Sequence, residues 1–206
     1  MFLKNGQIVN IEAPFTGVDG IQYPANFLVG AAPETLADFN IVEIEDPIAL
    51  DEKYYYNSLN ADGTYISTPK SKEQILGPIK SAIKAKRNYL TSTGGYQVGD
   101  NWYHSDNISR AQQTGLALLG ANLPQVEWKT MAGTYVTMTP ELALEILSAA
   151  TKSDIAIFKV AKNHIDTLEA INEDPLAINE ETAEEMITRI SAYDWEADWP
   201  ETFKLL

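Results

Sequence analysis

The stretch NWYHSDNISRAQQTGLALLG, residues 101–120, places His104, Ser105 and Asp106 in a row behind two aromatic residues. Histidine, serine and aspartate are the residue types of a catalytic triad, in which the hydroxyl lies about 3 Å from an imidazole that the carboxylate orients. Neighbouring residues of a strand point to opposite faces, so Ser105 cannot readily face His104. Ser105 and Asp106 are better explained as caps of the helix that follows, and we predict no catalytic residue here.

Metal, cofactor and phosphate sites have equally little support in the sequence. The chain has no cysteine, and its two histidines, His104 and His164, form no His-Glu-x-x-His motif. The glycines of TSTGGYQVGD lack the Gly-Lys-Ser/Thr of a phosphate loop. We therefore expect no metal, no cofactor and no enzymatic activity. His164, expected to face solvent near Asp166, leaves a His–carboxylate site open as the alternative.

The charge and hydropathy of the chain exclude two classes of partner. Its formal net charge is −14, and residues 173–201 hold ten acidic residues against one basic residue. Nucleic acids require clustered lysine and arginine, so we expect no nucleic-acid binding. The small basic cluster is predicted to be a solvated helix face: Lys80, Lys84, Lys86 and Arg87. No run approaches ~18 apolar residues and the N-terminus resembles no secretory signal, so we expect no membrane insertion.

Residues 1–70 are predicted to form a small β-rich attachment module at the N-terminus. Asn5-Gly6 is a strong turn signal between two short strands, and Asp62-Gly63 marks a second hairpin. Pro33 suits the first turn of a short helix that ends at Asn40, and a strand follows over 41–45. Residues 67–72, STPKSK, are predicted to be a linker or a domain boundary.

Residues 71–174 are predicted to form an α+β domain of hairpins and helices. Gly77-Pro78 should interrupt a first helix, so the firm helix is expected over 78–90. Two hairpins follow, with turns at Gly99-Asp100-Asn101 and at residues 131–133, MAG, and between them lies a helix. That helix carries Ile108, Ala111, Leu116 and Leu119 toward Gly120.

A long helix is predicted over about 140–172, because Thr139-Pro140-Glu141 is a strong start and no glycine or proline follows before 175. Its apolar residues recur at alternating steps of three and four, which indicates a heptad seam. The seam consists of Leu144, Leu147, Thr151, Asp154, Phe158, Ala161, Ile165 and Leu168. This face could pack on the chain's own hairpins, or it could form a homo-oligomer through the long helix, and both alternatives stay open.

Five aromatic residues lie on the two hairpins of this domain: Tyr96, Trp102, Tyr103, Trp128 and Tyr135. Aromatic side chains can stack on sugars or bases, so a receptor- or glycan-binding role is one interpretation. The favoured interpretation is that Trp102 and Trp128 fill the core beneath the long helix.

Residues 175–206 are predicted to form an acidic helix, capped by Asn179, and an aromatic C-terminal segment. Burying three large aromatics at ~200 Å² each contributes on the order of 15 kcal/mol. Ordering about a dozen residues costs roughly 1–2 kcal/mol each, so the two effects nearly cancel. The segment should be ordered only against a groove on its own body or on a partner. We predict it to be a docking segment whose partner-binding residues are Tyr193, Trp195, Trp199, Phe203 and Leu206.

Several stretches resemble proteins of tailed-bacteriophage tails. IQYPANFLVGAAPETLADFNIVEI is similar to the N-terminal segment of many tail-associated proteins. Residues 79–200 resemble an uncharacterised phage tail domain through AKRNYLTSTGGYQVGDNWYHSD, RAQQTGLALLGAN, VEWKTMAGTYVTMTPELALEI, the long helix and DWP. The resemblance carries no active-site residues, and the acidic helix after Pro175 departs from shorter members. It implies a tail-fibre or baseplate protein of the virion, made in the host cytoplasm.

The sequence therefore predicts an α+β protein that acts as a non-enzymatic phage tail component through contacts with other tail proteins. The first alternative is a tail-fibre assembly chaperone that binds the fibre tip. The second is a receptor- or glycan-binding module.

Overall fold

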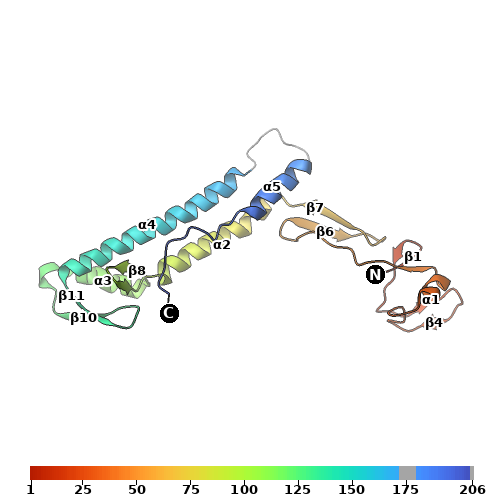
Figure 1. The fold of residues 1–206 in the computed structure, drawn as a ribbon, viewed down its shortest axis with the longest axis horizontal. Coiled ribbons are helices and arrows are strands. Elements are labelled where there is room, and N and C mark those ends of the chain that lie inside the picture. The colour runs from red at the N-terminus through yellow and green to blue at the C-terminus, as the bar shows by residue number, and fades with distance from the viewer. Residues whose placement is uncertain (172–179, 205–206) are drawn as a thin grey trace. The chain divides into compact units, whose positions relative to one another are not determined.

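The computed structural model describes residues 1–171 and 180–204, and it confirms the α+β class (Figure 1). The chain divides into two compact units, Met1–Ser71 and Lys72–Leu206. Short antiparallel strands dominate the first unit, whereas long helices and two hairpins make up the second. The described part of the segment after 175 belongs to the second unit.

The sheet of the first unit has the antiparallel order β2-β1-β5. Its strands are β1 (Phe2–Lys4), β2 (Gln7–Ile8) and β5 (Ile41–Glu43). The turn between β1 and β2 has φ values of 53° at Asn5 and 77° at Gly6, which are favourable only for residues such as asparagine and glycine. The predicted first hairpin is therefore confirmed.

An aromatic cluster fills the core of the first unit beside this sheet. The small hairpin of β3 (Phe15–Thr16) and β4 (Gln22–Tyr23) supplies two of its rings. The predicted short helix is α1 (Pro33–Asp38), which ends near Asn40 at a φ of 56°. Ring centroids in the cluster lie 4.5–6.2 Å apart, and its members are Phe15, Tyr23, Phe27 and Phe39.

The hairpin of β6 (Tyr55–Leu59) and β7 (Tyr65–Pro69) closes the first unit, as predicted from Asp62-Gly63. The linker predicted over 67–72 is wrong at its start, because β7 extends to Pro69. Cross-strand pairing outweighs the polar composition there, since the Ser67 hydroxyl donates to the Asn57 side chain at 2.6 Å.

The second unit begins with α2 (Lys72–Thr93), which passes through Pro78 without a break. The helix start predicted at 78 is therefore wrong. A proline inside a helix costs about 3 kcal/mol. The turn before it buries Ile75 and Leu76, which are 3% and 2% exposed, and this burial offsets the cost.

Two hairpins and a helix connect α2 to the long helix. The first hairpin is β8 (Tyr96–Val98) with β9 (Asn101–Tyr103), and the second is β10 (Val126–Lys129) with β11 (Tyr135–Met138). Both predicted hairpins are confirmed. Between them lie α3 (Asn107–Leu119) and a short 3-10 turn, η1 (Gly120–Asn122).

The apolar residues predicted along α3 do not form one buried face. Ile108 is 73% exposed and Leu119 is 45% exposed, and Ala111 is exposed as well, whereas Gln113 is buried. Of the four predicted residues, Leu116 packs against the core. The helix turns this way because hydrogen bonds hold Gln113 inside: its side chain pairs with the Tyr96 hydroxyl and donates to the His104 carbonyl at 3.1 Å.

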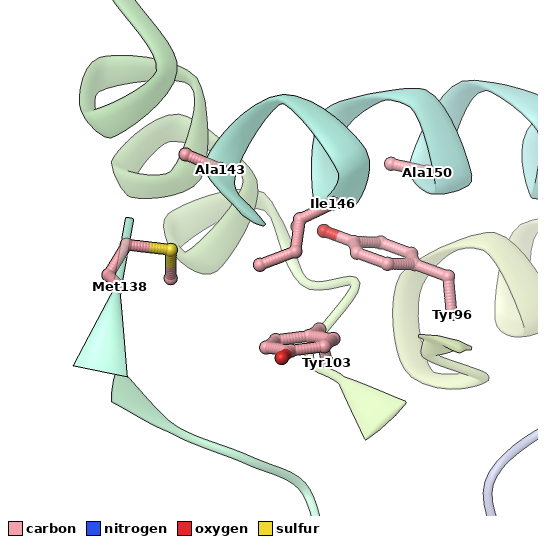
Figure 2. Close-up of a cluster of buried hydrophobic side chains, with 6 residues drawn as sticks. All are labelled: Tyr96, Tyr103, Met138, Ala143, Ile146 and Ala150. Atoms are coloured by element: carbon pink, nitrogen blue, oxygen red, sulfur yellow. The ribbon is translucent and has the colours of Figure 1, made fainter. Parts of the chain in front are cut away.

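The predicted long helix is α4 (Pro140–Ala170), which runs antiparallel beside α2 (Figure 1). Thr139 caps it, since its hydroxyl accepts a hydrogen bond from Leu142 N at 3.1 Å. The core beneath its first turns consists of Tyr96, Tyr103, Met138, Ala143, Ile146 and Ala150. Figure 2 shows Ile146 pointing from α4 toward the two tyrosine rings.

The buried seam of α4 shares Ala161 and Leu168 with the predicted one, and its other residues lie about one position away. It consists of Ala143, Ile146, Ala150, Ile157, Ala161, His164 and Leu168. Three alanines let the bulky neighbouring elements approach the helix, and larger residues lie on the next face. Leu144 and Phe158, both predicted in the seam, are 57% and 51% exposed. His164, predicted to face solvent, is 5% exposed.

The acidic helix is α5 (Glu180–Ala192), and its predicted cap Asn179 lies outside the described residues. Met186, Ile187 and Ile190 are buried on one stripe, as the pattern predicts.

Candidate functional site

Two side chains of the triad-like stretch have structural tasks. The Ser105 hydroxyl is buried and accepts a hydrogen bond from Gly95 N at 3.0 Å. The Asp106 carboxylate caps α3, because it accepts from Ile108 N and Ser109 N at 3.0 Å. The hydrogen bonds from the Ser109 hydroxyl and these amides lower the pKa of Asp106. The cap predicted at Asp106 is therefore confirmed, whereas Ser105 bonds to the loop before β8 and does not cap the helix.

Arg110 ties the helices of the second unit together. Its guanidinium donates two hydrogen bonds to Asp154 on α4, at 2.6 and 2.8 Å. It also donates to the carbonyls of Ser105 and Thr91, at 2.6 and 2.7 Å, and lies 5.6 Å from the Tyr96 ring centroid. The hydrogen bonds to Asp154 raise the pKa of Arg110. This cluster satisfies its own polar groups, so it stabilises the fold rather than binding a ligand.

The C-terminal segment, residues 193–204, packs along α2 and α4. His164 on α4 lies 2.7 Å from the Tyr193 hydroxyl through Nδ1 and 3.1 Å from the Ala197 carbonyl through Nε2. A carbonyl only accepts, so Nε2 carries the proton and the Tyr193 hydroxyl donates to Nδ1. The Trp199 ring lies 5.6 Å from the imidazole. These contacts satisfy both nitrogens of a buried histidine.

Contacts with α2 and the loop after it hold the rest of the segment. Lys86 Nζ donates to the Glu196 carbonyl at 3.0 Å and lies over the rings of Trp195 and Trp199. Further along, Phe203 N donates to the Gly94 carbonyl at 2.9 Å.

Four of the five predicted partner-binding residues thus contact their own unit: Tyr193, Trp195, Trp199 and Phe203. All four are half-buried, and Leu206 lies outside the described residues. Their role in binding another protein stays a prediction. The solvated face predicted for the basic cluster also needs revision, because Lys80, Lys86 and Arg87 contact Glu169, the C-terminal segment and Phe158.

A cleft of about 520 Å³ opens between the β8–β9 hairpin, α4 and the C-terminal segment. Trp102 lines it on the hairpin side, and Glu145 and Lys152 line it on the α4 side. Glu201 contributes from the C-terminal segment. The core position predicted for Trp102 is wrong, because Trp102 lines this cleft, whereas Trp128 packs against the core beneath α4 as predicted.

Two helices of the second unit expose apolar stripes. On α3 the stripe comprises Ile108, Ala111, Gly115 and Leu118, which recur at steps of three and four and are exposed. Ile108 is 73% and Leu118 is 82% exposed. On α4 the exposed apolar residues are Leu144, Leu147, Ile155 and Phe158. Apolar side chains at this spacing on a helix normally face a partner.

Two further findings apply to the part of the chain that the structure describes. No group of three or more histidine, aspartate or glutamate side chains in residues 1–171 and 180–204 could hold a metal ion. None of the helices in these ranges is both long and apolar enough to cross a membrane.

The comparisons with known proteins find a family match for only part of the chain. Residues 72–188, more than half of the sequence, match the model of a family described as "Domain of unknown function (DUF4376)". No curated protein and no solved structure matches the chain.

Proposed function

The chain belongs to the DUF4376 family, a domain of unknown function, and from that premise we propose that it is a non-enzymatic phage tail component acting through protein–protein contacts. The sequence resemblance to tail-associated proteins supplies the setting. The exposed apolar stripe of α3 is the observation that carries the contact role.

This stripe is costly to leave in water. Leu118 is 82% exposed, and burying its apolar surface against a partner would contribute about 25 cal/mol of stabilising free energy for each Å² removed from water. Gln113, Leu116 and Ala117 face the core on the same helix, so the stripe lies on the side of α3 that is turned away from the unit's interior. Contiguous exposed apolar surface of this kind typically marks a protein interface.

The stripe of α4 supports the same role. Leu144, Leu147, Ile155 and Phe158 follow a spacing close to that of a coiled-coil seam, which suits a helix as the partner. The partner in this proposal is another fibre or baseplate protein. A homo-oligomer through α4 is the alternative that light scattering of the purified chain distinguishes.

Mass spectrometry of purified virions combined with crosslinking tests the tail role. We expect the chain in fixed stoichiometry, with crosslinks that join the α3–α4 region to a fibre or baseplate protein. If the chain is absent from virions but bound to the fibre during assembly, the chaperone alternative replaces the structural role. If it contacts no tail protein at either stage, the proposal is wrong.

A charge placed on the α3 stripe tests the surface itself. Leu118→Glu should abolish incorporation into virions, because a carboxylate on the apolar stripe would be desolvated on binding. Gln112→Glu adds the same charge at an exposed position of the same helix and should leave incorporation unchanged. Circular dichroism checks that both variants fold.

A further inference from the structure

The cleft beside Trp102 has the size and lining of a small-molecule site. Its volume of about 520 Å³ falls within the range of roughly 300–1,000 Å³ that is typical of ligand pockets. Three separate elements form its walls: the β8–β9 hairpin, α4 and the C-terminal segment. Tyr96, Val98 and Ala149 line it and also pack in the core beneath α4, whereas Trp102, Glu145, Lys152 and Glu201 have no part in that core.

Trp102 supplies an aromatic wall that the fold holds in place. Successive residues of β9 point to opposite faces, and Tyr103 is buried in the core at 1% exposure. Trp102 therefore faces away from the core and toward the cleft. Its ring centroid lies 6.3 Å from that of Phe203 at a tilt of 55°, which fixes the indole against the C-terminal segment.

The opposite wall presents a row of polar groups. Glu145, Ser148 and Lys152 line the cleft from α4, where their spacing places them on one face of the helix. Glu201 approaches from the C-terminal segment. Within residues 1–171 and 180–204, no ion pair uses Glu145, Lys152 or Glu201. Their donors and acceptors can therefore serve a ligand.

The chemistry of these walls selects one class of ligand. Two carboxylates against one ammonium group give the cleft a negative charge, within a chain of net charge −14, and so disfavour anions. Charged and hydroxyl side chains disfavour a purely apolar molecule, which would leave them unpaired. A neutral sugar ring fits, since its hydroxyls donate to carboxylates and accept from an ammonium group while its C–H face packs on an indole.

We propose that the cleft between β8–β9, α4 and the C-terminal segment binds a neutral saccharide, with Trp102 as the stacking platform and Glu145, Lys152 and Glu201 as hydrogen-bonding groups. This inference does not rest on the tail role, because the lining of the cleft carries it and the apolar stripes of α3 and α4 do not.

NMR of the isotope-labelled full chain tests the proposal directly. The probes are the methyl glycosides of glucose, galactose, mannose and N-acetylglucosamine, with methyl glucuronide as the anionic counterpart. At least one neutral glycoside should shift the indole N–H signal of Trp102 saturably at millimolar concentrations and leave that of Trp128 in place. Saturation by the glucuronide alone, or by none of the five probes, would overturn the proposal.

Two variants on α4 distinguish glycoside binding in the cleft from a general effect of surface charge. Lys152→Met should weaken glycoside binding about tenfold, because hydrogen bonds to a charged group are lost. Lys159→Met removes the same charge at an exposed position two turns along the helix and should leave the affinity unchanged. Equal weakening by both variants would show a general charge effect and contradict the assignment. Glu201→Gln, away from the helix, gives a second reading if Lys152→Met alters the fold.

Discussion

The imidazole of His164 and the hydroxyl of Tyr193, 29 residues apart in sequence, lie 2.7 Å from each other. This hydrogen bond fastens the C-terminal segment to the last third of the long helix, and the second nitrogen of the ring lies 3.1 Å from the Ala197 carbonyl.

Replacing Tyr193 by phenylalanine should loosen the segment, because Nδ1 of a buried histidine then loses its donor. We expect a loss of about 1 kcal/mol in the free energy of unfolding and faster amide exchange over 193–204. Tyr89→Phe, at a tyrosine that is 65% exposed, is the matched control and should change neither quantity. Unchanged exchange in the Tyr193 variant would mean that this bond does not hold the segment.

Two glycines of the second unit should respond in opposite ways to alanine. A Cβ at Gly94 would lie 2.6 Å from the Leu90 carbonyl oxygen and 2.7 Å from the Thr202 side chain, so Gly94→Ala should displace the C-terminal segment. A Cβ at Gly115, inside α3, would meet nothing within 4 Å, and Gly115→Ala should stabilise that helix by about 1 kcal/mol. Chemical denaturation with tryptophan fluorescence measures both effects, and a Gly94 variant as stable as the parent would contradict the close approach.

The ion pair of Arg110 and Asp154 should contribute more to stability than a surface pair on the same helix. Asp154→Asn removes the negative charge that faces the partly buried guanidinium of Arg110. It should lower the free energy of unfolding by about 2 kcal/mol. Asp166→Asn breaks the exposed pair with Lys162 and should cost less than about 0.5 kcal/mol. Urea unfolding of the two variants makes the comparison, and similar losses would show that the Arg110 cluster is not a structural centre.

The stability of the second unit should fall at high pH through Tyr96. Burial raises the pKa of Tyr96 to about 12, from 10.0 in an exposed tyrosine. A group with a raised pKa stabilises the fold fully below its unfolded pKa, so the contribution of Tyr96 is present up to pH 10 and disappears as the pH rises toward about 12. Denaturation of the parent and of Tyr96→Phe over this range measures it. The two pH dependences should diverge, and parallel curves would contradict the burial of the hydroxyl.

The parts of the fold that could be predicted from sequence are those that local chemistry determines. Positive φ at Asn5, Gly63 and Gly99 follows from the residue types themselves, and each hairpin around them was predicted. The start of α4 at Thr139-Pro140 is local in the same sense, since a cap and a proline at the first position need no distant partner.

Features that depend on distant contacts were not predictable from pattern alone. α2 continues through Pro78 because Ile75 and Leu76 are buried, and α3 turns its apolar side outward because Gln113 pairs with Tyr96. The alanine- and leucine-rich sequence of α3 supports either orientation, so only the polar contact decides between them.

The candidate cleft illustrates the same limit. The sequence allowed Trp102 a stacking role but favoured a core position, and its polar neighbours in the cleft come from α4 and from Glu201 near the C-terminus. The spacing of Glu145, Ser148 and Lys152 placed them on one face of a helix, and no local signal indicated that this face meets the hairpin.

Because the C-terminal segment covers the surface around His164 and Lys86, a protein that uses this surface must compete with a ligand already tethered to it. A covalently linked competitor acts at an effective concentration in the millimolar range. A separate peptide of equal intrinsic affinity would therefore displace the segment only at a similar, millimolar concentration. Peptides at lower concentration would stay unbound, and the protein would need no conformational change to exclude them.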